Sequence, residues 1–326
     1  MNDSLQKGAQ VMRCCRVVIL CLLATASFGA PLLGASDTAG IYRVVHGWPA
    51  LPDGFALGEV SGVAVDSHNR VCIFHRGDRP ILCFDGATGK IVASWGAGMF
   101  SIAHGLRVDD EDNVWVTDAG HHQVYKFSRN GDLLMTLGAK DVPGLDRNHF
   151  NRPTDVAVAP TGEFYVSDGY GNSRVAKFSA QGEFLLDWGT KGDQPGEFDT
   201  PHNIALDAQG RVYVADRGHS RIQIFAGNGK FLYQWKSPEL GRPWGLAVGP
   251  DGYLYVVDGG DLKIGSAGRG RVFRLDLRGN ILEKWASYGR YDGQLYWGHA
   301  VAVAKNGDVY VTDILGLRVQ KFVKAP

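Results

Sequence analysis

The sequence has no excess of charge of either sign. Its 326 residues include 34 lysines and arginines and 34 aspartates and glutamates, so the formal net charge is zero. No block of like charge interrupts the chain. Because a nucleic-acid-binding domain normally carries a basic stripe or patch, the balanced charge predicts that nucleic acid is not a partner.

Cysteine is also scarce. Three of the five cysteines, Cys14, Cys15 and Cys21, lie near the N-terminus, so only Cys72 and Cys83 remain in the rest of the chain. This count excludes a scaffold held by many disulfides. The two remaining cysteines fall on neighbouring predicted strands, and export would permit a bridge between them. We expect two reduced thiols packed in the protein core.

The sequence lacks an apolar run long enough to cross a membrane as a helix, which takes about 20 residues. Three basic residues precede a shorter apolar run, 17–26, and small residues follow as far as Ser36. This order is typical of a secretory signal. We predict a signal segment over 1–36, cleaved between Ala26 and Ser36, and a secreted or periplasmic protein with no stable membrane span. An uncleaved anchor is the alternative.

One pattern recurs six times along the chain. An apolar segment is followed by a polar turn and a second, aromatic-rich segment that usually ends in aspartate, and further short segments with glycine turns come after it. The six apolar segments are 62–66, 105–109, 155–159, 203–207, 245–249 and 300–304. Four short antiparallel strands repeated roughly every 40 to 55 residues indicate propeller blades. We predict an all-β, six-bladed β-propeller in one domain, 37–326, whose first strands are apolar because they line the axis.

The sixth repeat stops after 318–323 and therefore lacks a fourth strand. The segment 42–45 is predicted to supply that strand. An N-terminal strand paired with the last blade would close the ring and remove two open sheet edges.

The residue directly before each first strand points to a metal site. In chain order this position holds Ser61, His104, Thr154, His202, Trp244 and His299. Alternate blades of a six-bladed ring are related by a three-fold rotation, so three histidines near the axis would converge. Three histidines with an open fourth position are typical of catalytic zinc. The alternative is that each histidine is a packed structural residue.

Residues just after the second strands should share the face that carries these histidines. Arg76 and Arg217 occupy that position in opposite blades, and Tyr170 lies one residue further along in blade three. Each of these side chains is also compatible with an ordinary turn. We expect the other histidines to be solvated or packing residues: His46, His68, His75, His121, His122, His149 and His219.

Two resemblances follow from these motifs. Leu137-Gly138, Trp188-Gly189 and 195–198 are similar to NHL repeats, a resemblance that is specific for the fold but not for function. A more specific resemblance is to the peptidyl-α-hydroxyglycine α-amidating lyases. It rests on the motifs at 74–78, 104–106, 148–150, 153–157, 167–174, 201–202 and 215–217.

The lyase resemblance implies an activity and a set of residue roles. Such lyases cleave the carbinolamide N–C bond of a peptide that ends in α-hydroxyglycine, and they release the peptide amide and glyoxylate. The family's metal-ligand positions fall on the three histidines of alternate blades. Its tyrosine falls on Tyr170, the candidate base. Its arginines fall on Arg76 and Arg217, the candidates for holding the substrate carboxylate.

The sequence departs from the lyase pattern in several places. The resemblance implies a structural calcium ion bound by main-chain oxygens of Val63 and Leu106, but Ala300 stands where the family has an acidic ligand. Trp297 stands where a methionine is usual. No residues are left for the family's companion copper monooxygenase domain, so we expect a lyase that works alone or on a supplied intermediate, either a peptide or a small α-hydroxy amide. We also expect a monomer.

Two other functions remain open from the sequence. The chain can be a non-catalytic, secreted NHL propeller that binds a protein or a ligand. It can also be a calcium-dependent lactonase-like propeller, although such sites are rich in oxygen ligands, whereas histidines favour zinc or another borderline metal.

Overall fold

A computed structural model describes residues 41–260 and 269–325. The chain divides into two units, and all described residues belong to the second, Ala39–Pro326. The predicted signal segment 1–36 lies outside the described residues. Within the described ranges, no helix is long and apolar enough to span a membrane.

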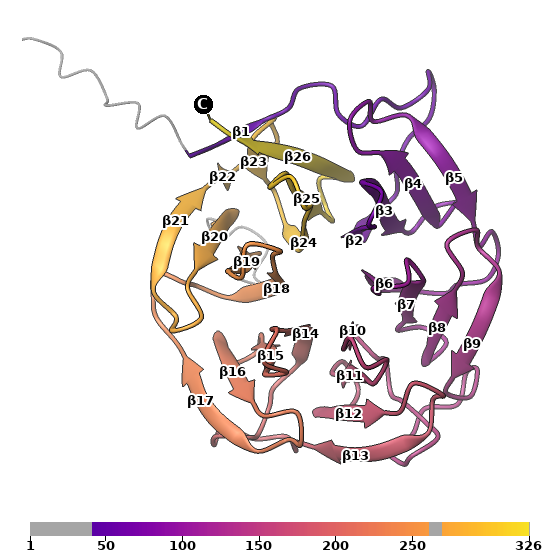
Figure 1. Cartoon of the computed structure of the whole chain (residues 1–326), viewed down its shortest axis with the longest axis vertical. Coiled ribbons are helices and arrows are strands. Elements are labelled where there is room, and N and C mark those ends of the chain that lie inside the picture. Colours follow the sequence, from indigo (N-terminus) through magenta and orange to yellow (C-terminus); the bar gives the residue numbers. More distant parts are fainter. Residues whose placement is uncertain (1–40, 261–268, 326) are drawn as a thin grey trace, which may run out of the picture. The chain divides into compact units, whose positions relative to one another are not determined.

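Six four-stranded antiparallel sheets are arranged around a ring, one sheet to a blade (Figure 1). The predicted six-bladed all-β propeller is therefore confirmed. Blades one to three consist of β2 (Val60–Val65), β3 (Arg70–His75), β4 (Ile81–Asp85) and β5 (Ile91–Trp95); β6 (Ala103–Val108), β7 (Val114–Asp118), β8 (Gln123–Phe127) and β9 (Leu133–Leu137); and β10 (Asp155–Val158), β11 (Phe164–Asp168), β12 (Arg174–Phe178) and β13 (Phe184–Trp188).

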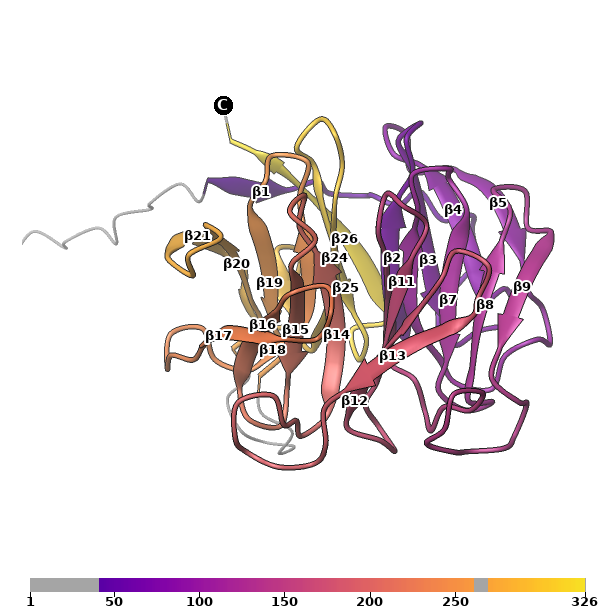
Figure 2. The same ribbon diagram turned by 60° about the horizontal axis from the view of Figure 1, so that its bottom comes forward.

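Blades four to six follow the same plan, and the tilted view in Figure 2 shows strands of a blade standing side by side. They consist of β14 (Pro201–Leu206), β15 (Val212–Asp216), β16 (Arg221–Phe225) and β17 (Phe231–Trp235); β18 (Pro243–Val248), β19 (Leu254–Asp258), β20 (Arg271–Leu275) and β21 (Ile281–Trp285); and β24 (Gly298–Val303), β25 (Val309–Asp313), β26 (Arg318–Lys324) and β1 (Tyr42–Val44). A short parallel pair, β22 (Ser287–Tyr288) and β23 (Gln294–Leu295), precedes blade six.

The ring closes through its first strand, as the sequence predicts. Strand β1 pairs antiparallel with β26, with Tyr42 opposite Lys324. The Val45 N–H extends this pairing by donating to the Lys321 carbonyl at 2.8 Å. Residues from opposite ends of the described chain therefore complete one sheet, which leaves blade six with no missing edge strand.

The hydrophobic core lies between the blades. Each of its six clusters joins the facing surfaces of two neighbouring blades, including blades six and one. The second strands are buried along their whole length, whereas outer strands such as β13 and β17 alternate between half-buried and exposed positions. This gradient arises because an inner strand is covered on both faces and an outer strand presents one face to water.

Aspartates shape the turns between first and second strands. In blade four, Asp207 Oδ1 accepts the backbone N–H groups of Gln209 and Arg211, each at 2.9 Å. Gly210 between them has φ +73°, a left-handed conformation that a residue without a Cβ adopts at little cost. The polar turn in the repeat thus reverses the chain within a few residues and sets the register of the two strands.

Blade one contains a disulfide, which corrects the expectation of two reduced thiols. Cys72 on β3 and Cys83 on β4 are directly opposite each other in the register, and their Cα atoms lie 4.0 Å apart. Their sulfur atoms are bonded. The sequence placed the two residues on adjacent strands, but only their pairing across the sheet decides that the sulfurs can meet.

The first strands are not apolar throughout, contrary to expectation. Arg107 on β6 is a polar side chain that donates hydrogen bonds to two others, Asp155 on β10 and Asn203 on β14. The expectation was wrong because it treated every first strand alike. Polar side chains can lie at the axis here because the Arg107 guanidinium bonds to oxygens of the other two.

Candidate metal centre

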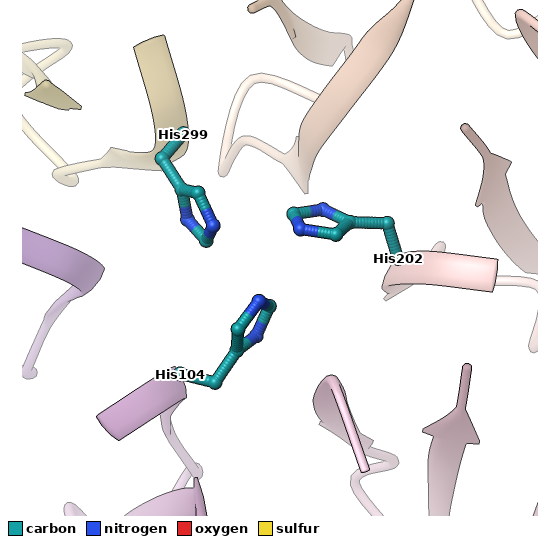
Figure 3. Close-up of side chains that lie close together, drawn as sticks. All are labelled: His104, His202 and His299. Carbon is teal, nitrogen blue, oxygen red and sulfur yellow. The ribbon is translucent and has the colours of Figure 1, made fainter. Parts of the chain in front are cut away.

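Three histidine side chains from alternate blades converge near the propeller axis (Figure 3). Each histidine is the second residue of its strand: His104 on β6, His202 on β14 and His299 on β24. Their ring centroids are 4.8 to 4.9 Å apart, and one ring nitrogen from each can lie within 4.8 Å of the others. The near-equal spacing follows from the three-fold relation of alternate blades. All three side chains are buried.

Each histidine is held by a hydrogen bond from Nδ1 to a backbone carbonyl of the next blade. The three bonds join His104 to Thr154 (2.5 Å), His202 to Trp244 (2.8 Å) and His299 to Ser61 (2.6 Å). The three acceptors occupy the histidine position in the blades that have no histidine. Because a carbonyl only accepts hydrogen bonds, Nδ1 carries the proton and the Nε2 lone pair remains for a metal ion.

Burial keeps the three rings neutral. Desolvation lowers the pKa of His104 and His202 well below the usual value, and the positive charge of the nearby Arg217 lowers both further. Desolvation lowers the pKa of His299 to about 3. A metal ligand must be the deprotonated ring, so these three residues meet the chemical requirement for a borderline divalent ion such as zinc.

In the three blades that carry these histidines, the aspartate that ends the second strand positions the approach to the histidine. Asp118 accepts the N–H groups of Ser101 and Ile102, just before His104. Asp313 in blade six holds the two residues before Gly298 in the same way, and Asp216 in blade four accepts the Asp199 N–H. These carboxylates are fully buried. The repeat motif therefore fixes the loop from which each ligand enters the centre.

Tyr170 lies directly beside the histidines. Its hydroxyl is 2.9 Å from His104 Nε2 and 3.2 Å from His202 Nε2. The residue follows β11, and its backbone N–H donates to the Arg152 carbonyl at 3.3 Å. The Arg152 guanidinium lies over the tyrosine ring, 5.6 Å from its centroid. Any substrate group that reaches the two histidine nitrogens therefore also reaches the Tyr170 hydroxyl.

Arg217 joins this group and is not an exposed turn residue. Its Nη1 donates to the Tyr170 hydroxyl at 3.3 Å, and its guanidinium stacks 4.3 Å from the Trp244 ring centroid. The side chain is buried, and its Nε has no hydrogen-bond partner among the described residues. A buried donor without a partner is costly, so this N–H is available to an anionic substrate group.

Arg76 lies on the same face but is held differently. Its Nη1 forms an ion pair with Glu59, and its Nε donates to the Ala103 carbonyl at 3.3 Å. Its charge lowers the pKa of both His104 and His299. About a third of the Arg76 side chain is exposed, so solvent and substrate can reach it. The sequence motif identified Arg76 but not Glu59, which no repeat position singles out.

Two tryptophans form a wall beside the histidines. The Trp244 ring centroid is 5.0 Å from that of His202 and 5.7 Å from that of His299. Trp297 packs edge-on against Trp244 at 5.5 Å. Trp244 stood in the repeat alignment as a position without histidine, and only the structure places it between two of the rings.

His75 has a structural role. It replaces the aspartate at the end of the second strand, and its Nδ1 accepts the Gly58 N–H at 3.1 Å, as the aspartates do in other blades. Its Nε2 donates to the Arg79 carbonyl at 2.7 Å. Burial lowers its pKa. The remaining histidines include several paired with aspartates: His46, His68, His121, His149 and His219.

The residues at the axis do not fit the calcium ion that Val63 and Leu106 suggested. Calcium takes six to eight oxygen ligands and favours carboxylates. Ala300 contributes a methyl group. A carboxylate at the equivalent position of blade three, Asp155, is already bonded to the Arg107 guanidinium. We therefore assign no step of the chemistry to calcium.

Known proteins share both the repeat and the overall fold. The NHL repeat model matches residues 100–127, 150–178 and 198–225. The solved structure of streptogramin B lyase superimposes with a TM-score of 0.61 at 17% identity, covering 83% of this chain and 95% of that one. At this identity the likeness supports the fold alone.

Relatives found by sequence identify the family more specifically. Peptidyl-glycine alpha-amidating monooxygenase A of Xenopus laevis is 37% identical over 309 residues, which cover 84% of this chain but only 32% of the relative. The chain thus spans about a third of that protein. Peptidyl-alpha-hydroxyglycine alpha-amidating lyase 2 of Drosophila melanogaster is 32% identical, covering 87% of this chain and 74% of the relative. The chain belongs to the family of peptidyl-α-hydroxyglycine α-amidating lyases.

Proposed function

We propose that this protein is a metal-dependent lyase that cleaves the carbinolamide N–C bond of peptidyl-α-hydroxyglycine or a related α-hydroxy amide. The observation that carries the proposal is the convergence of three buried, neutral histidines with the Tyr170 hydroxyl in hydrogen-bond contact with two of them. The products would be an amide and glyoxylate.

His104, His202 and His299 would hold the metal ion, for which we propose zinc. Three nitrogen ligands with the opposite ring nitrogen bound to a carbonyl are the usual surroundings of catalytic zinc. When bound, zinc supplies Lewis acidity toward a substrate oxygen and favours loss of its proton.

The two arginines would bind the carboxylate of the substrate. A guanidinium matches a carboxylate with two parallel N–H donors. Arg76 is the better candidate because its side chain is partly exposed and because it already pairs with a carboxylate, that of Glu59. Arg217 is the second candidate, through its buried Nε.

Tyr170 would act as the base toward the substrate hydroxyl. It takes the hydroxyl proton as a phenolate, whose negative charge the Arg217 N–H stabilises. The O–H electrons then form the carbonyl of glyoxylate, and the electrons of the C–N bond go to the amide nitrogen. The nitrogen takes up one proton, so the cleavage requires no oxidant, reductant or net water.

We also propose that the protein is exported to the periplasm or outside the cell. The charged, apolar and small-residue order of 1–36 is typical of a secretory signal. The Cys72–Cys83 disulfide supports the proposal because such bonds persist in oxidising compartments.

The test combines elemental analysis with an assay. We would measure metals in protein purified without chelators, beside a His202→Ala variant made in the same way. We expect one equivalent of zinc in the parent, its loss in the variant, and glyoxylate release from α-hydroxyhippurate by the parent alone. A folded parent with no transition metal and no glyoxylate release would contradict the lyase and leave a binding propeller.

A further inference from the structure

Arg107 is unusual among the residues that line the propeller axis. It lies three residues after the histidine position of blade two, on β6. The equivalent residue of every other blade is alanine: Ala64, Ala157, Ala205, Ala247 and Ala302. A single long cationic side chain therefore occupies a level of the axis where the other five first strands each contribute one methyl group.

The Arg107 guanidinium is surrounded by oxygen atoms from three other blade strands. Its Nη2 lies 2.5 Å from Asp155 Oδ2, 2.8 Å from Asn203 Oδ1, 3.0 Å from the Ile204 carbonyl and 2.9 Å from the Leu246 carbonyl. Its Nε also faces both Asp155 oxygens. One nitrogen with two hydrogens cannot donate fully to four oxygens. The arrangement is that of a cation within an oxygen cluster.

The same oxygens link the neighbouring strands to one another. Asp155 Oδ2 also accepts the Ile204 N–H at 3.2 Å, and Asn203 Oδ1 accepts the Leu246 N–H at 2.7 Å. Strands β6, β10, β14 and β18 are therefore joined through one network. Because Asp155 is almost completely buried, removal of the guanidinium would leave a buried carboxylate without its countercharge, which is strongly destabilising.

The network lies directly beside the histidine centre along the chain. Asp155 follows Thr154, whose carbonyl holds the His104 ring, and Asn203 follows His202. Displacement of β14 would therefore move the His202 ring, and displacement of β10 would move the carbonyl that holds the His104 ring.

We infer that Arg107 is the axial cation of this propeller: its guanidinium ties the first strands of blades two to five together and replaces a structural calcium ion. A divalent ion at this level would face the positive guanidinium, and the nearby carboxylate of Asp155 is already neutralised. The fold and the histidine centre are thus independent of calcium. The inference does not depend on the proposed reaction.

The first experiment uses the unaltered protein. We would free it of calcium in buffer that contains zinc, then measure its calcium content by elemental analysis and its Tm with and without excess calcium chloride. We expect calcium well below one equivalent and an unchanged Tm. One equivalent of retained calcium, or a clear rise of Tm on adding it, would overturn the inference whatever the activity of the enzyme.

The second experiment removes the guanidinium. Arg107→Met should lower Tm by about 5–8 °C, the shift expected on breaking a buried ion pair in a domain of this size. Arg107→Lys keeps the positive charge but not the planar guanidinium, and it should lower Tm by less than Arg107→Met. Arg211→Met is the matched control, because that arginine also pairs with an aspartate, Asp207, but is more exposed. A Tm loss for Arg107→Met no larger than that of the control would refute the role.

A double variant tests the exchange directly. Arg107→Met with Ala300→Asp removes the internal cation and restores a carboxylate at the axis. We expect calcium chloride to raise the Tm of this variant while leaving the parent unchanged. A folded double variant that calcium does not stabilise would contradict the idea that guanidinium and calcium are interchangeable here. If neither Arg107 variant folds, the calcium measurements on the unaltered protein still decide the question.

Discussion

The histidine centre and the Arg107 cluster are two levels of the same axis, built from the same first strands on opposite principles. At the histidine level, one residue type repeats in alternate blades, and the rings are spaced almost equally. At the Arg107 level, one arginine, one aspartate and one asparagine come from three consecutive blades. The repeated histidines offer three equivalent nitrogen ligands that need a metal ion to bind. The cluster of Arg107, Asp155 and Asn203 already contains a cation, the Arg107 guanidinium.

The difference shows how a propeller can separate catalysis from stability along one axis. The histidines leave their Nε2 lone pairs directed to a shared centre, where the Tyr170 hydroxyl contacts those of His104 and His202. In the Arg107 cluster, Arg107 Nε and Nη2, both Asp155 oxygens and Asn203 Oδ1 are bonded to other protein atoms. The largest expected effects on activity therefore belong to the first level, and the variants below rank them.

The largest effect should come from losing one ligand. His299→Ala leaves two histidines, which cannot complete a three-nitrogen site. We expect loss of zinc and a fall of glyoxylate release to background, while the Tm measured without metal changes little in comparison with Arg107→Met. Retention of full zinc and activity by this variant would show that His299 is not a ligand.

Tyr170→Phe should come next. It removes the hydroxyl that contacts two ligand nitrogens but keeps the ring beneath Arg152 and Arg217. We expect kcat to fall by about 100- to 10,000-fold, the usual contribution of a positioned acid or base, with zinc content unchanged. Steady-state kinetics beside metal analysis separates the two. A variant with normal kcat would exclude Tyr170 as the base.

Arg76→Met should have a smaller effect, confined to substrate binding. Loss of one charge-assisted pair predicts a fall in kcat/KM of roughly 10- to 100-fold for substrates with a free carboxylate. Glu59→Gln is the control, because it removes the partner and keeps the guanidinium. We expect the control to bind substrate at least as well as the parent. Equal losses in both variants would mean that the ion pair, not the guanidinium, matters.

The acid stability of the zinc-free protein, unlike the effects above, does not concern activity. The folded-state pKa values of the three histidines lie below the unfolded value, and that of His299 is about 3. As pH falls below about 6.5, the unfolded chain binds protons first, so the free energy of unfolding decreases by roughly 1.4 kcal/mol per pH unit for each histidine until its folded pKa is reached.

Urea unfolding of the zinc-free protein at several pH values measures this slope. His299→Asn removes one titrating ring and should give a shallower dependence between about pH 6.5 and pH 3 than the parent. An equal slope in both proteins would indicate that His299 is not held neutral by burial. Asparagine keeps a polar side chain of similar reach, so the comparison isolates the titration.

Repeats made the histidine level predictable from the sequence. Once the six segments are aligned, equal positions in the repeat become equal positions around the ring, and the three histidines of alternate blades must meet. The same reasoning placed Tyr170 and Arg217 on their face and assigned residues 42–45 to the closing strand, of which Tyr42–Val44 form β1. The family motifs at Arg76 and Tyr170 pointed to the same residues.

The mixed contacts were not predictable in this way. Asp155 and Asn203 share one repeat position, directly after the histidine position, whereas Arg107 lies two residues further along its strand. Alignment does not show that these side chains meet, and the prediction of wholly apolar first strands was wrong. The contacts of Glu59 with Arg76 and of Trp244 with His202 were also missed, because an alignment of repeats does not give contacts between side chains. The expected pair of reduced thiols was also wrong, because bonding of Cys72 to Cys83 depends on which residues face each other across two strands.

By itself, the sequence determined the number of blades, the strand order and the residues that share the histidine face. These properties depend on the periodicity of the sequence, and each of the six repeats carries the same pattern. Tertiary structure alone decided which carbonyl holds each histidine ring, which nitrogen is left for a metal, and which cation fills the axis. Those properties depend on single contacts between side chains of different blades, whose distances only the closed ring establishes.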